Sequence, residues 1–305
     1  MAQATRDIQR RIRSVRSTRK ITKAMELVAA AKMRKAVKKV LATRSYSDLV
    51  WQTVLHLAGK VDKNEHPFFE NREQVNKAGI ILVSSNRGLC GSFNLQLVNK
   101  VLLSMKLHHP EAATEIITFG SRGRLESQRR GLKLIADFPK TDITQNITDI
   151  RSMAHLVTKE FLDKNYDRIF IAYTDFVSSL RQVPHLKQLL PIVPQVDERL
   201  GHISHEKMAN QDKINVDSFS EFLFEPNTAE VLMAFLPRLV EVQIYQAVLE
   251  SEASEHSARM LAMRNASDAA ADMIDFLTLA FNQSRQAGIT AELAEIAAGS
   301  AALQN

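Results

Sequence analysis

Apolar and small residues recur in alternating steps of four and three along the last quarter of the chain, between residues 228 and 303. Ten of the twelve positions in this series are apolar. The repeat predicts one long α-helix packed against a second long helix, with alanines that let the two backbones approach closely. This helix would span roughly 110 Å, several times the diameter of a compact domain. The series consists of Ala262, Ala266, Ala269, Met273, Phe276, Ala280, Gln283, Ala287, Thr290, Ala294, Ala297 and Ala301.

The beginning of the chain has a similar helical pattern of apolar and small residues. From residue 5 to about residue 58 there is no Pro and no Gly, and Ala, Leu, Met, Lys and Arg are abundant. This composition predicts a second long helix, roughly 80 Å in length. Apolar or small residues stand at helical spacing at Ile8, Ile12, Val15, Met25, Ala29, Ala36 and Val40.

The charges of the two ends are opposite. Residues 1–44 contain 14 Lys and Arg but only two acids, a net charge of +12. Residues 225–305 contain four Arg and eleven Asp and Glu, a net charge of −7. Attraction between opposite net charges favours docking of the two helices. An antiparallel coiled coil is therefore predicted.

Between the two helices the pattern changes to short apolar, β-branched runs that alternate with helical segments. The alternation predicts right-handed βαβ crossovers and a Rossmann-like, mostly parallel sheet. The proline-punctuated stretch from 183 to 194 predicts an edge strand. Strands are expected at 78–85, 115–119, 132–136 and 168–173, with helices near 94–107, 122–130 and 149–163. The fold class is thus α/β, divided into an N-terminal coiled-coil helix (1–58), a linker (59–77), an α/β domain (78–224) and a C-terminal coiled-coil helix (225–305).

Composition narrows the class of protein. With 305 residues, 45% of them apolar and 24% charged, the chain is long enough for one or two globular domains. A single cysteine, Cys90, excludes an internal disulfide framework. No apolar run approaches the ~20 residues that cross a bilayer, so we expect no membrane span. The Arg-rich first 25 residues also fit a mitochondrial transit peptide, although the helical pattern continues through them.

The clearest candidate for chemistry is the loop of residues 85–94, SNRGLCGSFN, which follows a strand and opens a helix. Doubly wound proteins bind phosphates at this position. The loop lacks both the three-glycine dinucleotide spacing and a Gly-Lys-Ser/Thr sequence, so a structural turn or a protein contact is the favoured interpretation. Cys90 has no His or acid beside it in the loop, which favours a small buried residue over a nucleophile. The nine His residues have no metal-ligand spacing.

Three stretches carry a resemblance to a known family: ITKAMELVAAAKMRK at residues 21–35, RGLCG at 87–91 and ITAELAEIAAG at 289–299. Together, and in this order, they closely resemble the gamma subunit of F-type ATP synthases. The match involves both ends and the middle of the chain. One departure is Ser300, where the family usually has Ala. The redox-sensitive dithiol of chloroplast members cannot form with Cys90 alone.

The resemblance implies a central rotor shaft that couples transmembrane ion flow to ATP synthesis and hydrolysis. The paired terminal helices would turn inside a hexamer of alpha and beta subunits, while the α/β domain would face the epsilon subunit and the membrane rotor ring. Catalytic sites would lie on the partner chains, so no catalytic residue, cofactor, metal, nucleic acid or small-molecule substrate is expected. One copy per complex is implied, peripheral on the cytoplasmic side of a bacterial cell membrane.

Site residues follow from the same resemblance. The family's contacts with beta subunits correspond to Lys20, Lys23, Met25, Lys32, Arg259, Gln286, Thr290 and Glu292. The uncharged last turns, from Ile296 to Leu303, would be held as an apical bearing by apolar side chains. Arg87, Gly88, Cys90 and Gly91 are further candidate site residues, in the loop at the strand end.

Two other classes of function remain open from the residues alone. The basic run at residues 32–39 fits a coiled-coil adaptor or a nucleic-acid-binding arm, although the aromatic residues that stack on single strands are missing. The loop from Gly88 to Gly91 fits an α/β enzyme. Salt-dependent DNA binding would favour the first class, and nucleotide binding by the isolated chain would favour the second.

Overall fold

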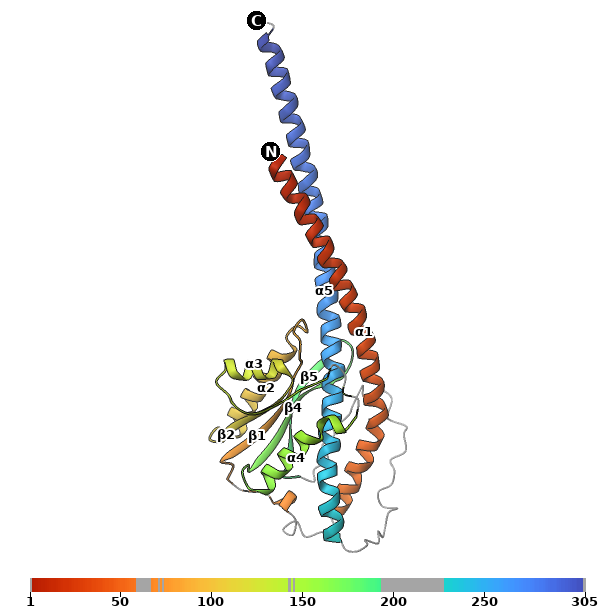
Figure 1. The fold of residues 1–305 in the computed structure, drawn as a ribbon, viewed down its shortest axis with the longest axis vertical. Coiled ribbons are helices and arrows are strands. Elements are labelled where there is room, and N and C mark those ends of the chain that lie inside the picture. The colour runs from red at the N-terminus through yellow and green to blue at the C-terminus, as the bar shows by residue number, and fades with distance from the viewer. Residues whose placement is uncertain are drawn as a thin grey trace. The chain divides into compact units, whose positions relative to one another are not determined.

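A computed structural model describes residues 2–58, 67–70, 72, 74–141, 144, 146–192 and 228–303. The chain forms two compact units, one of residues 1–29 with 259–305 and one of residues 30–258. Two long helices, α1 (Ala2–Ala58) and α5 (Thr228–Leu303), run through both units (Figure 1). The predicted linker 59–77 and the predicted domain end at 224 involve residues outside the described ranges, so these boundaries stay predictions.

The unit of residues 30–258 contains a five-stranded sheet in the order β3-β2-β1-β4-β5. Strands β1 to β4 are parallel, and β5 is antiparallel to β4 at the edge. The predicted α/β class, the mostly parallel sheet and the proline-containing edge strand are confirmed. The strands are β1 (Lys77–Val83), β2 (Ala113–Phe119), β3 (Lys133–Phe138), β4 (Arg168–Phe176) and β5 (Gln182–Leu190). The helices are α2 (Phe93–His108), α3 (Ser121–Arg129) and α4 (Thr148–Leu162), with a short 3-10 helix η1 at Pro67–Phe69.

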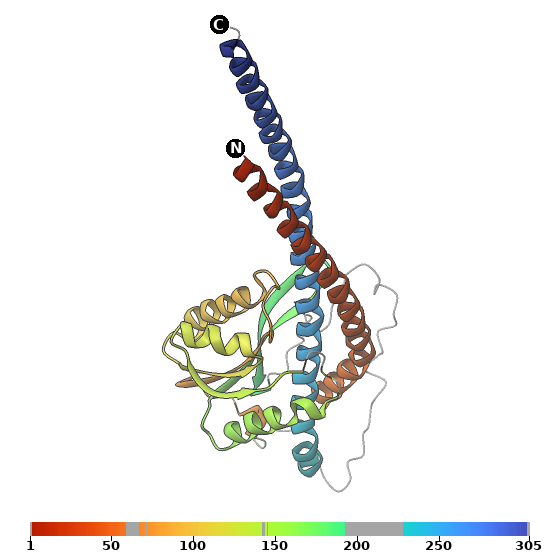
Figure 2. The same cartoon turned by 45° about the horizontal axis from the view of Figure 1, so that its top comes forward.

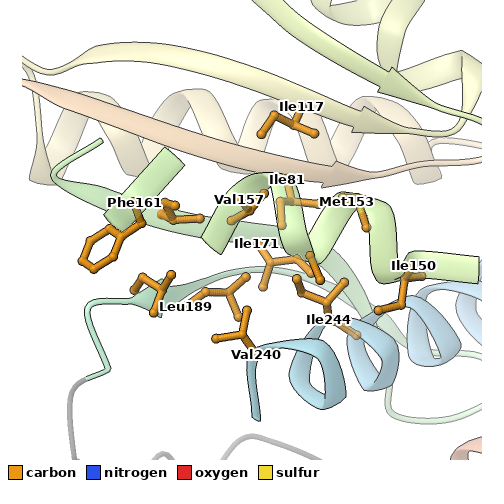
Figure 3. Packing of buried hydrophobic residues seen from close by; sticks show 14 of the residues in the cluster. Ile81, Ile117, Ile150, Met153, Val157, Phe161, Ile171, Leu189, Val240 and Ile244 are labelled. Atoms are coloured by element: carbon orange, nitrogen blue, oxygen red, sulfur yellow. The ribbon is translucent and has the colours of Figure 1, made fainter. Parts of the chain in front are cut away.

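Both faces of the sheet are covered, which explains why the central strands β1 and β4 are continuous apolar runs. Helix α2 packs on one face through Leu97, Val98 and Val101. Helix α4 and the beginning of α5 cover the other face, as Figure 2 shows from a second direction. In Figure 3, Ile81 and Ile171 of the sheet lie close to Met153 of α4 and Ile244 of α5. Part of α5 therefore completes the core of this unit.

A buried carboxylate fixes the amino end of the sheet. Glu115 accepts hydrogen bonds from the Tyr166 hydroxyl at 2.6 Å and from Lys133 Nζ at 2.7 Å, and it lies 3.2 Å from Lys77 Nζ. Burial disfavours the charged form of Glu115, but these hydrogen bonds outweigh burial and lower its pKa below the usual value of 4.5. The carboxylate thus ties β1, β2 and β3 together.

The unit of residues 1–29 and 259–305 is a pair of antiparallel helices (Figure 1). Thr5 near the start of α1 lies beside Ser284 of α5, with hydroxyl oxygens 3.1 Å apart. Farther along α1, Arg19 lies near Ser267 of α5. The predicted antiparallel pairing is confirmed, and Ile12 and Ala29 are buried as the pattern in α1 predicted. The described helices contain no stretch long and apolar enough to cross a bilayer.

Candidate functional site

The loop after β1 is held from inside by one side chain. Asn94, in the first turn of α2, accepts a hydrogen bond from the backbone N–H of Ser85 at 3.1 Å. Its amide group also donates to Ser85 Oγ at 2.8 Å and to Cys90 Sγ at 3.4 Å. Cys90 is only 1% exposed. The cysteine is therefore part of the packing of the loop, as the sequence indicated.

The outer side of the same loop is exposed. Leu89 is 61% exposed and has φ = 63°, a left-handed conformation that is uncommon for leucine. Gly91 has φ = 59°, which suits glycine. Arg87 is exposed beside Leu89, and Gly88 approaches the guanidinium of Arg122, since a Cβ there would lie 3.1 Å from Nη2. The loop presents an arginine and a leucine to its surroundings.

Helix α5 occupies the carboxyl end of the sheet, where doubly wound proteins bind their ligands. Ser251 Oγ donates to the carbonyl oxygen of Val83, the last residue of β1, at 3.3 Å. Lys140 Nζ donates to the carbonyl oxygen of Ser84 at 3.1 Å and pairs with Glu255 at 2.8 Å. A helix of the chain itself thus fills this place, which argues against the enzyme interpretation of the loop. Within the described residues, no group of three or more His, Cys, Asp or Glu side chains is arranged to hold a metal ion.

A close approach beside the loop explains a second requirement for glycine. The backbone N–H of Gly123 donates to Ser84 Oγ at 2.7 Å. A Cβ at Gly123 would lie 2.7 Å from the same oxygen, closer than real Cβ contacts. Helix α3 can therefore reach the end of β1 only without a side chain at this position.

Three buried glutamates of α5 were not singled out from the sequence. Glu250, Glu252 and Glu255 are at most 7% exposed when the whole residue is counted. Burial raises the pKa of Glu252, although Lys140 and hydrogen bonds from Thr144 act in the opposite direction. In the sequence these residues counted only as acidic charge of the helix. The run of serines and glutamates at residues 250–257 was the available indication of a buried polar face.

The coiled-coil seam on α5 differs from the predicted series by one residue. Its buried positions in the unit of residues 259–305 are Met263, Ser267, Ala270 and Ile274, and half-buried residues continue at 277, 281, 284, 288 and 291. Ala269, Met273 and Phe276 of the predicted series are exposed. In an alanine-rich helix, two series that differ by one residue both fit the alternation of four and three, and only the partner helix selects between them.

Two residues of the predicted series, Met273 and Phe276, instead belong to a set of exposed apolar residues on α5. Phe276 is 69% exposed, and Met273 and Leu279 are more than half exposed. Toward the C-terminus, Ile289, Leu293 and Ile296 are also at least half exposed. Apolar side chains of this size, gathered along one helix, indicate a surface that a partner covers. We call these six residues the outer stripe.

Two of the basic residues expected to contact partners, Lys20 and Lys23, lie on α1 within this coil. Lys20 and Lys23 are exposed and line one groove together with Arg16 and Arg19 of α1 and Asp268 of α5. Lys23 also pairs with Glu26 of its own helix at 2.9 Å. Met25 is half-buried. The structure therefore brings Lys20 and Lys23 together on one basic surface.

The other expected contact residues are more widely distributed. Gln286, Thr290 and Glu292 are exposed on α5, and Arg259 is half-buried. Glu292 lines a groove with Arg6 of α1. Ile296 is 70% exposed, while the side chain of Leu303 lies outside the described residues. Lys32 and the loop at 87–91 belong to the unit of residues 30–258, so the structure does not join them to the same site.

Comparison with known proteins identifies the family. The family model described as ATP synthase matches residues 4–303. The ATP synthase gamma chain of Roseiflexus castenholzii is 41% identical over 305 residues, covering 98% of each chain. That of Moorella thermoacetica is 38% identical over 301 residues, covering 98% of this chain and 99% of its own. The chain belongs to the ATP synthase gamma-chain family.

The fold agrees with this membership in the gamma-chain family. The rotor of the Euglena gracilis mitochondrial ATP synthase has a TM-score of 0.64 at 19% identity, covering 95% of this chain and 100% of that one. The central stalk of the Tetrahymena thermophila mitochondrial ATP synthase has a TM-score of 0.57 at 22% identity, covering 81% and 99%. At these identities the likeness shows the fold alone. The family model and the gamma-chain relatives confirm the resemblance predicted from residues 21–35, 87–91 and 289–299, and the family model matches residues 4–303.

Proposed function

We propose that the chain is the central rotor shaft of an F-type ATP synthase. The exposed outer stripe on the coil of residues 1–29 and 259–305, with Phe276 69% exposed, is the observation that carries this proposal. A two-helix coil that serves only to hold itself together places its large apolar residues in the seam. Here alanine and serine occupy half of the buried seam positions, and a phenylalanine faces outward.

The shaft acts by differential contact. An outer stripe on one helix and a basic groove beside it make the coil surface asymmetric. At each angle of rotation, such a surface stabilises the open state of one surrounding catalytic site and the closed state of another. Rotation driven by ion flow would then release ATP, and hydrolysis would turn the shaft in the opposite direction. The surrounding sites are those of alpha and beta subunits.

Catalysis belongs to the partner chains in this proposal. The position where an α/β domain usually binds nucleotide holds Ser251 and the Lys140–Glu255 pair. We therefore expect no heat of binding when the purified chain is titrated with Mg-ATP. A dissociation constant in the micromolar range that is lost in Gly88→Ala or Gly91→Ala would contradict this expectation.

The remaining partners and the location follow from the family. The α/β domain would contact the epsilon subunit and the membrane rotor ring, with one copy of the chain in each complex. The complex would lie at the cytoplasmic side of a bacterial cell membrane. Co-purification from solubilised membranes, with a count of the partner chains, tests this assembly.

Reversal of Lys20 and Lys23 on the basic surface, together with Lys32 farther along α1, tests the contact with beta subunits. In the assembled complex, Lys20→Glu, Lys23→Glu and Lys32→Glu together should lower ion pumping per ATP hydrolysed, because like charges would face acidic loops at contacts that change with angle. Hydrolysis itself is expected to persist. The matched control replaces the same three residues by Arg and should pump normally. Wild-type pumping by the Glu variant would mean that these lysines only face solvent, and loss of DNA binding would favour the adaptor alternative.

A further inference from the structure

Helix α5 buries an unusually polar face where it crosses the carboxyl end of the sheet. Glutamate is rarely buried unless it is paired, yet Glu250 is 1% exposed and Glu252 is fully buried. Gln246, His256 and three serines lie in the same stretch. The buried polar positions are Gln246, Glu250, Ser251, Glu252, Ser254, Glu255, His256 and Ser257.

The loop after β3 provides the principal partners of this face. Lys140 Nζ pairs with Glu255 at 2.8 Å, with side chains that are 2% and 9% exposed. The backbone N–H of Thr144 donates to Glu252 Oε1 at 2.9 Å, and the Thr144 hydroxyl donates to the same oxygen. We call Lys140, Thr144, Glu252 and Glu255 the clasp.

One further segment bonds to the clasp, and another holds α5 just after it. Lys39 of α1 donates to the carbonyl oxygen of Thr144 at 2.7 Å. Two residues beyond Glu255, Ser257 Oγ donates to the carbonyl oxygen of Ser179, in the loop between β4 and β5, at 2.6 Å. Gln182, at the start of β5, donates to Ser257 Oγ at 3.2 Å. All of these residues belong to the unit of residues 30–258.

Stability alone does not account for a buried ion pair in this position. Removing two charges from water costs about as much as their attraction returns, and apolar residues of similar volume often stabilise a protein as well or better. The best-attested role of such pairs is to specify one register among several. Apolar contacts of α5, such as those of Val240 and Ile244, are non-directional and favour burial at any similar angle. The clasp favours one angle only.

We propose that the clasp fixes the rotational angle of α5 against the α/β domain and thereby carries torque between them. The inference rests on the proposed rotor function and assigns these four residues a positioning role. Torque applied to the α/β domain would reach the shaft through directional bonds that cannot slip without leaving a buried charge unpaired. The apolar core would hold the helix in place, and the clasp would hold its angle.

The test uses the complete ATP synthase in vesicles, with Lys140→Met and Glu255→Leu combined so that neither partner of this ion pair is left buried without the other. We expect assembly and ATP hydrolysis close to wild type and a several-fold loss of ions pumped per ATP. Ile244→Val is the matched control, because it weakens the apolar contact of the same helix without touching the clasp, and it should pump normally. Equal pumping by the double variant and the wild type would overturn the proposal, as would an equal loss in Ile244→Val.

A second variant covers the case in which the double variant does not assemble. Thr144→Val removes the hydroxyl donor to Glu252 and introduces no charge, and it should lower pumping per ATP in the same direction. Wild-type pumping by Thr144→Val would then overturn the proposal. The lysine reversal described above separates the two proposals: if the reversal uncouples the complex and neither clasp variant does, the rotor function stands and the clasp does not.

Discussion

Enlarging a seam alanine should open the coil, and the neighbouring residue offers a control. Ala270 is 8% exposed in the seam, whereas Ala269 faces outward. Ala270→Leu adds three carbon atoms where the helices meet, and such overpacking typically costs about 1–3 kcal/mol. Ala269→Leu adds the same atoms without meeting the partner helix. The two variants have the same composition and nearly the same helix propensity, so they differ only in the side of the helix.

Hydrogen exchange of the isolated chain measures the difference. If the seam is strained by about 1–3 kcal/mol, its local opening constant rises roughly 5- to 160-fold at 25 °C. Amides of residues 10–29 and 259–280 should therefore exchange faster in Ala270→Leu than in the wild type, and Ala269→Leu should match the wild type. Equal exchange in both variants would contradict a seam at Ala270. Faster exchange in Ala269→Leu than in Ala270→Leu would show that the seam follows the series first predicted from the sequence.

Three further predictions concern the unit of residues 30–258. Because the folded-state pKa of Glu115 lies below 4.5, its stabilisation is complete well above that pH and is lost as the pH falls through the folded-state value. Glu115→Gln should thus lower the unfolding free energy by about 1.5–3 kcal/mol near pH 7, and a difference that stays constant down to pH 3 in denaturant titrations would contradict this. Gly123→Ala, whose Cβ would lie 2.7 Å from Ser84 Oγ, should destabilise by about 1–3 kcal/mol; an unchanged melting temperature would refute the close approach. Leu89→Gly should be neutral or stabilising by up to about 1 kcal/mol, because Leu89 has φ = 63° and buries little; a clear loss in a thermal melt would show that the side chain contributes to packing.

The secondary structure was largely available from the sequence. The period of the apolar positions separates α1 and α5 from the sheet because a 76-residue helix and a seven-residue strand differ in both period and length. The edge position of β5 followed from Pro184, which cannot donate a hydrogen bond in a central strand. These features depend on residues that are close together in the sequence, and few other structures fit the same pattern.

The register of the seam and the buried glutamates depended on tertiary contacts. The sequence shows that Phe276 lies on an apolar stripe, but not whether the stripe faces another helix of the same chain or a partner. Glu252 and Glu255 looked like solvated charges because their partners, Thr144 and Lys140, are more than 100 residues away. No spacing within a helix indicates a lysine that arrives from a distant loop.

Rotation of the chain itself is the most direct test of the account. The alpha and beta subunits would be fixed to a surface, and a probe would be attached to the α/β domain at an exposed residue such as Arg130 replaced by Cys, in a Cys90→Ser background. Observed by single-molecule microscopy, the probe should turn in one direction while Mg-ATP is present and stop when ATP is removed. A probe that stays fixed relative to the hexamer while ATP is hydrolysed would contradict the rotor function.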